Sequence, residues 1–432
     1  MRIPTIDCVT GQGGEYFEQL KSRSQLDMRE ERERVCEIIE AVRSRGDAAL
    51  LEYEARFDRV ELTCGTLEVT EAEIQEAYRQ VGDEWLSCLR QAIASIRDFH
   101  ERQKKQSWMN AEPGRVVGSR VIPMKRVGVY APGGRALYPS TVLMDALPAK
   151  VAGVREIILC TPPQPDGKAP AVTLVAAREV GVDRIFKAGG AQAVAAMALG
   201  TDTIPRVDKI VGPGNIYVTL AKRELYGYVG IDMVAGPSEV LVVADDSATP
   251  RYVAADLLSQ AEHDPLAAAI LVTPSAGLLA AVREELEKQC AALPKKEIAE
   301  HSLTHFGALI RVSDLAQAIE IANTIAPEHL ELSVAEPFAW LGAVENAGAV
   351  FLGHYAPEPL GDYFAGPNHV LPTSGTARFF SPLSVDDFVK RSSVIYYSQD
   401  ELKKVYQTVA ALADSEDLAA HARSVRIRFE EQ

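Results

Sequence analysis

Apolar residues in the first hundred positions recur at the three- and four-residue spacing of amphipathic helices. The first stripe, which Gly46 ends, consists of Val35, Ile38, Ile39 and Val42. A second stripe, in a stretch from about residue 71 to 105, consists of Trp85, Leu86, Leu89 and Ile93. We expect residues 1–126 to form a helical N-terminal region that packs on the second of two α/β units. We expect no chemistry in this region, and His100 at its surface.

From Val127 onward the pattern changes to short apolar runs, each followed by glycine or proline and then by a stretch of helical length. The runs of the first series are residues 127–130, 156–160, 184–187 and 209–211. Strands that alternate with helices form parallel sheets. The pattern therefore predicts a first Rossmann-like unit over residues 127–236.

A second series of the same kind follows. Its predicted strands are residues 239–243, 268–272, 309–312 and 349–352, and its predicted helices are residues 250–262, 275–292 and 313–324. This series predicts a second unit over residues 237–380. Beyond it, residues 394–397 read as a strand and residues 400–414 and 416–428 as helices, within a C-terminal arm over residues 381–432. The predicted fold class is α/β, with two tandem Rossmann-like parallel-sheet units, a helical N-terminal region and a small C-terminal helical arm.

Composition narrows the class of protein. A chain of 432 residues is too long for one ordinary core, and 47% hydrophobic with 24% charged residues is typical of a soluble globular protein. The net charge of −15 argues against nucleic acid or an anionic membrane as partner. No apolar run is long enough to span a bilayer.

The cysteines and the start of the chain bear on its compartment. None of the six cysteines stands in a C-x-x-C pair, so free thiols in a reducing compartment are the simplest interpretation. The first residues, Met1-Arg2-Ile3-Pro4-Thr5, lack the apolar core of a signal peptide. We expect a cytoplasmic protein.

Glycine clusters follow three of the first-series strands: Pro132-Gly133-Gly134, Gly189-Gly190 and Gly212-Pro213-Gly214. In an open α/β sheet this is the edge where ligands bind, and backbone amides there suit a pyrophosphate. However, no G-x-G-x-x-G follows a strand with an acidic residue about twenty positions on. Any one cluster is explained as a turn, but three in one unit favour a nucleotide site.

Two polar pairs stand in the second unit. Gln260 and His263 lie three positions apart, so on a helix they would share one face and form half of a metal site, or else simply a polar helix end. Glu328 and His329 pair a carboxylate with an imidazole, which suits proton transfer near neutral pH. The alternative for this second pair is the first turn of a helix.

Longer motifs resemble the histidinol dehydrogenase family, whose zinc enzymes end histidine biosynthesis. They are Tyr130-Ala-Pro-Gly-Gly134, Gly212-Pro-Gly-Asn215, Ala235-Gly-Pro-Ser-Glu-Val240, Gln260-Ala-Glu-His-Asp264, Ala326-Pro-Glu-His-Leu-Glu331, Leu360-Gly-Asp-Tyr-Phe-Ala-Gly-Pro-Asn-His369 and a late Glu416…His421. The resemblance covers nearly the whole chain and is weakest in the first hundred residues.

The resemblance implies a role for each matching position. It implies NAD contacts at Tyr130, Gln192 and Asn215, and catalysis of proton transfer by Glu328 and His329. It implies one zinc ion per site, held by Gln260, His263, Asp362 and His421. Only the resemblance selects Asp362 among sixty acidic residues. The implied substrate contacts are Ser238, Gln260, His263, His329, Asp362, His369, Glu416 and His421.

The implied reaction is the oxidation of L-histidinol through L-histidinaldehyde to L-histidine with two NAD⁺. The family resemblance also implies a homodimer whose sites borrow Glu416 and His421 from the other subunit. One alternative is a family member that acts on another small primary alcohol. A second is a metal-dependent hydrolase, because zinc beside a Glu-His pair also suits attack by water. A third is a non-catalytic binding protein with two α/β lobes.

Overall fold

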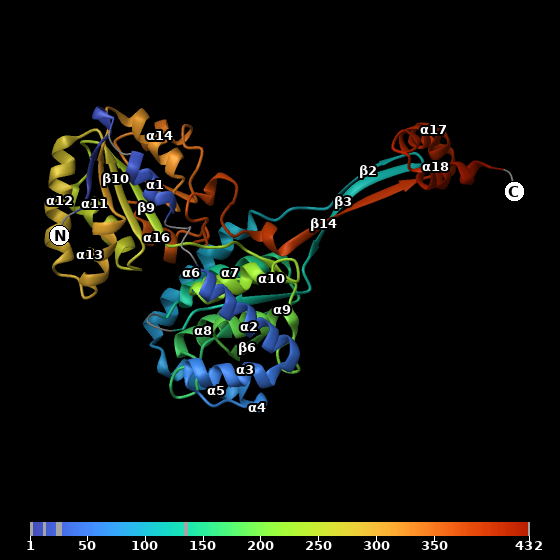
Figure 1. Cartoon of the computed structure of the whole chain (residues 1–432), viewed down its shortest axis with the longest axis horizontal. Helices are drawn as coiled ribbons and strands as arrows, with labels where there is room; N and C mark the ends of the chain where they lie inside the picture. Colours follow the sequence, from blue (N-terminus) through green and yellow to red (C-terminus); the bar gives the residue numbers. More distant parts are fainter. Residues whose placement is uncertain (1–2, 12–13, 23–27, 134–136, 431–432) are drawn as a thin grey trace. The chain divides into compact units, whose positions relative to one another are not determined.

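Two parallel sheets and one antiparallel sheet organise the described part of the chain (Figure 1). The computed structural model describes residues 3–11, 14–22, 28–133 and 137–430. The first two residues and Gly134, the last residue of the first glycine cluster, lie outside it. One compact unit comprises Met1–Gln103 and Met124–Phe388, and a second comprises Lys104–Pro123 and Val389–Gln432.

The first sheet has five parallel strands in the order β6-β5-β4-β7-β8. Its strands are β4 (Arg126–Tyr130), β5 (Glu156–Thr161), β6 (Arg184–Lys187), β7 (Lys209–Val211) and β8 (Gly230–Ile231). Numbered along the chain, this is the order 3-2-1-4-5 of a Rossmann half. The strand order reverses between β4 and β7, while all strands stay parallel. The predicted strands of the first unit are confirmed, and β8 is added to them.

Helices cover both faces of this sheet. On one face, one core cluster unites the strands with α5 (Glu71–Gln80), α6 (Asp83–Glu101), α7 (Pro139–Ala152) and α8 (Ala171–Val180). On the other face, a second cluster unites them with α2 (Arg29–Arg45), α3 (Asp47–Tyr53), α4 (Cys64–Leu67), α9 (Gly190–Leu199) and α10 (Ile216–Leu225). A π-helix, η3 (Glu54–Asp58), continues α3.

Two predictions for the N-terminal region are wrong. Helices α2 to α6 pack on the first sheet, and not on the second, because both apolar stripes join the cores of that sheet. His100 is buried, and not at the surface, because it extends the buried face of α6 beyond Ile93 and Ile96. Its Nδ1 lies 2.8 Å from the Ile96 carbonyl oxygen, which only accepts, so Nδ1 carries the proton.

The second sheet has six parallel strands in the order β1-β11-β10-β9-β12-β13. They are β1 (Thr5–Asp7), β9 (Glu239–Ala244), β10 (Ala268–Thr273), β11 (Ala308–Arg311), β12 (His329–Ser333) and β13 (Ala349–Leu352). Apart from β1, this is again the order 3-2-1-4-5. Every residue of β9, β10 and β12 is buried, as expected for parallel strands covered on both faces.

The helices of the second sheet lie on both of its faces as well. One face carries α11 (Pro250–Ala261), α12 (Ala276–Cys290) and α13 (Lys296–His305). The other carries α1 (Gly14–Ser22), α14 (Leu315–Ile325) and α15 (Pro337–Leu341). A short helix, α16 (Glu358–Tyr363), follows β13. Turns of 3-10 helix occur at η1 (Cys8–Thr10) and η4 (Thr376–Arg378). A further turn, η5 (Val385–Phe388), packs against the core of the first sheet through Phe388.

The second compact unit is an antiparallel sheet with two helices. Its strands, in the order β14-β3-β2, are β2 (Trp108–Glu112), β3 (Arg115–Pro123) and β14 (Val389–Tyr397). Its helices are α17 (Gln399–Ser415) and α18 (Ala419–Arg426), followed by η6 (Ile427–Phe429). The two predicted C-terminal helices are confirmed, but Glu416 lies just after α17 and not on the last helix.

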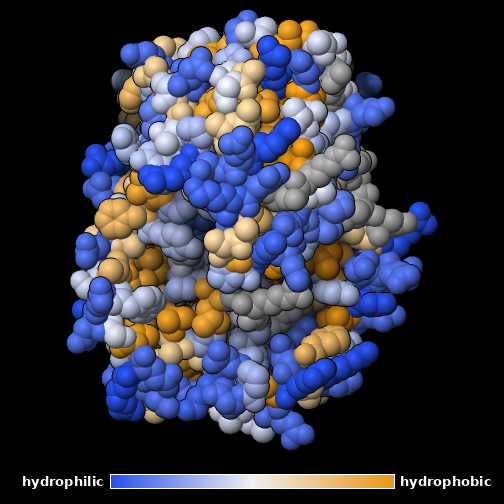
Figure 2. All heavy atoms as spheres, turned by 90° about the vertical axis from the view of Figure 1, so that its left-hand side faces the viewer, coloured by the Kyte–Doolittle hydropathy of each residue, from blue (hydrophilic) through white to orange (hydrophobic). Residues whose placement is uncertain are grey.

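Hydrophilic side chains cover much of the face shown in Figure 2, with hydrophobic residues interspersed among them. Among the helices that the structure describes, none has the length and apolar character that a membrane span requires.

Candidate active site

The three predicted cofactor residues lie at the carboxyl ends of strands of the first sheet. Tyr130 is the last residue of β4, Gln192 lies in the first turn of α9 after β6, and Asn215 is the N-cap of α10 after β7. The Tyr130 hydroxyl accepts a hydrogen bond from the Gly190 N–H at 3.0 Å, so it contacts the beginning of α9. The structure therefore joins Tyr130 to the helix that carries Gln192.

Asn215 has a structural task in addition to any contact with a ligand. Its Oδ1 accepts from the backbone N–H groups of Tyr217 at 3.0 Å and Val218 at 3.2 Å. This is an N-cap of the usual kind, and it fixes the side chain at the start of α10.

The sequence did not predict a network of buried charges beneath the Gly212 turn. The Gly212 N–H donates to Asp232 Oδ2 at 2.9 Å, and its carbonyl accepts from Lys222 Nζ at 2.9 Å. Lys222 and Asp232 also form an ion pair. Gly212 has a φ of +111°, and a Cβ there would collide with the Tyr130 carbonyl oxygen. The network therefore holds a turn that only glycine allows.

In the second sheet, the predicted proton-transfer residues lie at the amino ends of strands. His329 is the first residue of β12, and Glu239 is the first residue of the neighbouring β9, preceded by the half-buried Ser238. His329 Nδ1 lies 2.9 Å from the Glu239 carbonyl oxygen. Because a carbonyl only accepts, Nδ1 carries the proton and Nε2 is the basic nitrogen. Nε2 is buried and has no hydrogen-bond partner among the described residues.

Glu328 lies directly before this strand. Its Oε2 accepts from the Glu239 N–H at 2.9 Å and lies 3.7 Å from His329 Nδ1. Burial raises the pKa of Glu328 well above its usual range. The alternative that this pair opens a helix is wrong, because β12 begins at His329.

The structure brings His263 and Asp362 together with a third group, Glu358. One ligand atom from each of the three lies within 4.8 Å of the others. His263 lies in the turn after α11, whereas Glu358 and Asp362 share one face of α16 at a spacing of four residues. Gln260 Oε1, near the end of α11, is buried and lacks a partner within the described ranges. Amide oxygen, imidazole and carboxylate together fit a zinc ion.

Buried acidic groups dominate the electrostatics of this cluster. Burial and the charge of Asp362 raise the pKa of Glu358 to about 7, and burial raises the pKa of Asp362. Glu358 Oε1 and Asp362 Oδ1 each lie 4.0 Å from His329 Nε2. Burial lowers the pKa of His369 to about 4, and its Nδ1 donates to the Asp362 carbonyl at 3.1 Å. A neutral His369 beside two carboxyl groups leaves the site attractive to cations.

Glu358 was missed by the sequence analysis, although a signal was available. It stands four residues before Asp362 in Pro357-Glu-Pro-Leu-Gly-Asp362, which is the spacing of one helix face. Two further contacts hold it in place: Ser259 Oγ donates to its Oε2 at 3.2 Å, and its N–H donates to Glu331 Oε1 at 2.8 Å.

Glu416 and His421 belong to the second compact unit. His421 lies on α18 and Glu416 in the turn between α17 and α18, and both are exposed in that unit. The other predicted site residues all belong to the first unit.

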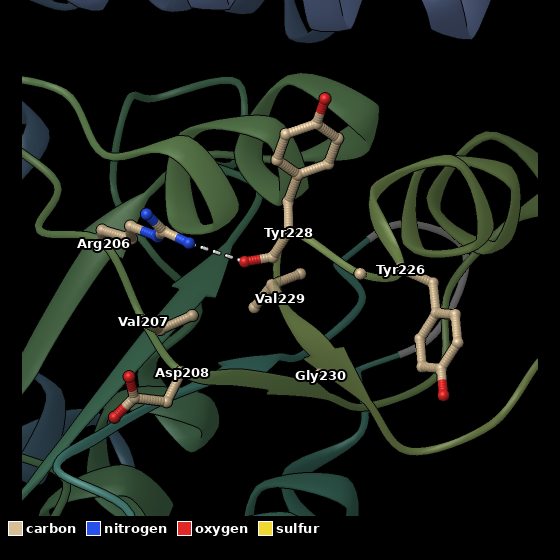
Figure 3. Close-up of a pocket in the computed structure, with 8 residues that line it drawn as sticks. Arg206, Val207, Asp208, Tyr226, Tyr228, Val229 and Gly230 are labelled. Atoms are coloured by element: carbon tan, nitrogen blue, oxygen red, sulfur yellow. Dashed lines mark hydrogen bonds between the residues drawn. The ribbon is translucent and has the colours of Figure 1, made fainter. Parts of the chain in front are cut away.

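An open pocket of about 380 Å³ lies at the amino ends of β7 and β8 (Figure 3). Arg206 Nη2 donates to the Tyr228 carbonyl across it at 2.7 Å, and Asp208 accepts from the backbone of Lys125 and Arg126. No predicted site residue lines this pocket. Because its charged side chains, Arg206 and Asp208, are engaged in holding the backbone, we assign no chemistry to it.

Comparison with known proteins identifies relatives along the whole chain. A sequence profile described as histidinol dehydrogenase matches residues 21–429. Histidinol dehydrogenase of Caldanaerobacter subterraneus is 57% identical over 413 residues, which are 96% of each chain. That of Geobacillus kaustophilus is 55% identical over 93% of this chain and 94% of its own. The crystal structure of histidinol dehydrogenase from Elizabethkingia anophelis superimposes with a TM-score of 0.92 at 37% identity, covering 99% of this chain and 98% of that one.

Proposed function

The chain belongs to the histidinol dehydrogenase family, which catalyses the last step of histidine biosynthesis, and we propose how its own residues carry out that reaction. The reaction oxidises the primary alcohol of L-histidinol to an aldehyde and then to the carboxylate of L-histidine. NAD, when bound, accepts a hydride in each of the two oxidations. The observation that carries the assignment of roles is the buried Nε2 of His329, which lies between two carboxyl groups and has its tautomer fixed.

We assign the zinc ligands to Gln260, His263 and Asp362 together with His421. The buried Gln260 Oε1 without a described partner and the His263–Asp362 cluster support this assignment. Zinc, when bound, orients the substrate through its amine and imidazole nitrogens. Glu358, which accepts a hydrogen bond from Ser259 and lies beside Asp362, steadies that carboxyl group.

His329 acts as the base in the first oxidation. Its Nε2 takes the hydroxyl proton of the alcohol while the hydride leaves the same carbon, so that the C–O single bond becomes the aldehyde carbonyl. The Glu239 carbonyl, by accepting from Nδ1, keeps the basic nitrogen at Nε2. It also lies where it can stabilise the imidazolium that results.

Glu328 acts in the second oxidation. Water adds to the aldehyde carbon, and Glu328 takes the proton that this water loses as the new C–O bond forms. The protonated His329 returns its proton to the aldehyde oxygen, which gives the neutral hydrate and restores the basic Nε2. Burial raises the pKa of Glu328, which makes its carboxylate a stronger base than an exposed one. His329 then takes a hydroxyl proton of the hydrate while the second hydride leaves, and the carboxylate of histidine forms.

We place the cofactor against Tyr130, Gln192 and Asn215 at the carboxyl edge of the first sheet. Ser238, His369 and Glu416 are the remaining contacts proposed for the substrate. Histidinol carries an amine, an imidazole and a hydroxyl, so carboxylate, hydroxyl and imidazole partners suit it. We also propose that the protein works in the cytoplasm, which agrees with its six free cysteines.

The assay for the function is NADH absorbance with L-histidinol and NAD⁺, with and without a chelator. We expect two NADH per histidinol and loss of the rate on chelation. A metal-dependent hydrolase or a binding protein would yield no NADH. His263→Ala should lose zinc and activity together, and a variant that keeps both would contradict the metal site as drawn.

We propose a homodimer in which each site takes Glu416 and His421 from the partner. Both residues belong to the second compact unit, and a terminal arm exchanges between subunits at low cost. His421→Ala and His329→Ala, each inactive alone, should regain activity when mixed, because one hybrid site then has both residues intact. No regain, despite demonstrated subunit exchange, would mean that each chain completes its own site.

A further inference from the structure

Glu54 is a buried carboxyl group in the N-terminal helices, where the sequence indicated no chemistry. It is the first residue of the π-helix η3 and is 0% exposed. π-Helical turns are rare and frequently occur at functional sites. The η3 turn directs Glu54 away from its own helix and toward the glycine turn after β6, to which it is hydrogen-bonded.

Both contacts of Glu54 Oε1 are with the predicted cofactor turn. It accepts from the Gly189 N–H at 3.0 Å and from Gln192 Nε2 at 3.0 Å. The next backbone donor, the Gly190 N–H, is taken by the Tyr130 hydroxyl. The free N–H groups at the beginning of a helix such as α9 are a common binding site for a phosphate. Here two of its N–H groups already have partners from the protein.

The contact with Glu54 also decides which end of the Gln192 amide is engaged. Because a carboxyl oxygen accepts, the Gln192 amide nitrogen faces Glu54 and the amide oxygen faces away from it. A Cβ on Gly190 would lie only 2.7 Å from Gln192 Oε1, so the amide oxygen is held over the Gly190 backbone. The Gln192 side chain is thus held in one orientation before any ligand arrives.

The second oxygen of Glu54 has no donor within the described part of the chain, and its neighbour is the Asp58 carboxyl group. Burial and the charge of Asp58 raise the pKa of Glu54 well above its usual range. A protonated Glu54 accepts through Oε1 and donates from Oε2 to Asp58, which satisfies the whole group. The other titratable groups that face it are Tyr130 and Cys160, whose pKa values burial raises, so neither offers Glu54 a charge partner.

We propose that Glu54 is a positioning residue for the cofactor, which fixes the Gln192 side chain and the beginning of α9 in the conformation that binds NAD. This inference rests on the proposed function, since it takes Gln192 as an NAD contact. The N-terminal helices then serve the reaction through this one side chain. The cofactor phosphates must bind away from the two N–H groups that Glu54 and Tyr130 already occupy.

A glutamine at position 54 separates this role from simple burial of a charge. The carboxamide of Glu54→Gln can accept from Gly189 and Gln192 and donate to Asp58, as the protonated acid does. Glu54→Leu fills the space and makes none of these bonds. Asp47→Asn is the matched control, because Asp47 is also a buried carboxyl group next to this segment, but it bonds to Thr203 and not to the cofactor turn.

The experiment measures kcat and the KM values for NAD and for histidinol on the full chain, together with zinc content. We expect Glu54→Leu to raise the KM for NAD by roughly tenfold or more, while kcat at saturating NAD and the KM for histidinol stay within about threefold. Glu54→Gln should stay within about threefold of the unsubstituted chain in all three constants, and so should Asp47→Asn. An unchanged KM for NAD in Glu54→Leu would overturn the proposal. So would an equal impairment of all three constants, that is, a lower kcat together with a higher KM for both NAD and histidinol.

Two further measurements test the proposal if Glu54→Leu does not fold or if the chain makes no NADH. If Glu54→Leu does not fold, Glu54→Asp takes its place, because an acid shorter by one methylene cannot reach both donors; an unchanged KM for NAD would then refute the role. If the unsubstituted chain makes no NADH from histidinol, the proposed function itself fails. Calorimetric titration with NAD alone then tests Glu54, and it must give the same order of affinities for the same variants.

Discussion

The two parallel sheets have the same strand order, apart from the added β1 of the second, but present their polar residues at opposite edges. In the first sheet, Tyr130, Gln192 and Asn215 lie at the carboxyl ends of strands, which is the usual ligand edge of an α/β sheet. In the second sheet, Glu239 and His329 are the first residues of their strands, and so they lie at the amino edge.

The polarity of the connecting helices explains this difference. At the carboxyl edge of a parallel sheet the next helix begins, and its free N–H groups attract anions such as phosphate. At the amino edge the preceding helix ends, and its carbonyls attract cations. His263 follows the end of α11, and Glu328 follows the end of α14 with two residues between. One fold, used at its two edges, therefore offers an anion site and a cation site.

The largest effect that tests this division is expected from His329→Asn. Loss of the base should lower kcat for both oxidations by about 10²–10⁴-fold. Zinc content and NAD affinity should stay unchanged, because the substitution lies on the second sheet and removes no ligand of the metal. NADH production, metal analysis and NAD titration on one preparation check this. If His329→Asn also lowered the affinity for NAD, the division of metal and cofactor between the two edges would be contradicted.

A comparable effect, on stability instead of activity, is expected from Lys222→Met in the first sheet. The substitution leaves Asp232 buried without its charge partner, and losses of about 3–5 kcal/mol are typical of such changes. Urea unfolding measures the loss. The pair is internal to the cofactor edge, so a change below about 1 kcal/mol would show that this network does not hold the Gly212 turn.

A smaller and more selective effect is expected from Glu328→Gln. The aldehyde step needs a proton acceptor for water and the alcohol step does not, so aldehyde oxidation should slow by about 10²-fold or more, and alcohol oxidation much less. Assays started from histidinol and from the aldehyde separate the two steps. Equal slowing of both would indicate that Glu328 only positions His329.

The smallest effect concerns pH. The pKa of Glu54 is raised by burial, so between its unfolded and folded values the native state holds a proton that the unfolded chain has lost. Stability must therefore fall as pH rises through that window. Glu54→Gln lacks this proton. The melting temperature of the variant minus that of the unsubstituted chain should therefore increase from pH 5 to pH 8, by on the order of 1–3 °C. A constant difference across this range would show that Glu54 does not titrate in this way.

The sequence pattern was sufficient to predict strands where their burial produces a continuous apolar run. The strands of the first sheet are apolar runs ended by glycine or proline, and the pattern predicted them, whereas the family resemblance selected Tyr130 and Asn215 at their ends. In the second sheet, the pattern did not predict β12, because Glu331 and Ser333 interrupt its apolar run. Glu331 is buried, and it accepts a hydrogen bond from the N–H of Glu358 at the start of α16. That partner lies far along the chain, so no local pattern contains it.

Other features depended on contacts that a pattern does not encode. The hairpin of β2 and β3 has an exposed first strand, so it lacks the alternation that marks a half-buried one. The stripes of α2 and α6 predicted helices correctly but could not say which sheet they cover. Glu54 and Glu358 are acidic residues among sixty, and only the fold places one on a cofactor turn and the other beside Asp362.

The most direct test of the division between the two edges is a paired measurement on Gln192→Leu and Gln260→Leu. These two substitutions remove the same amide group, one from each edge, and zinc content and NAD affinity are determined for both proteins. We predict that Gln192→Leu keeps its zinc and binds NAD more weakly, whereas Gln260→Leu loses zinc and binds NAD as before. If either substitution changed both quantities, or if the losses were exchanged, the assignment of cofactor and metal to separate edges would be contradicted.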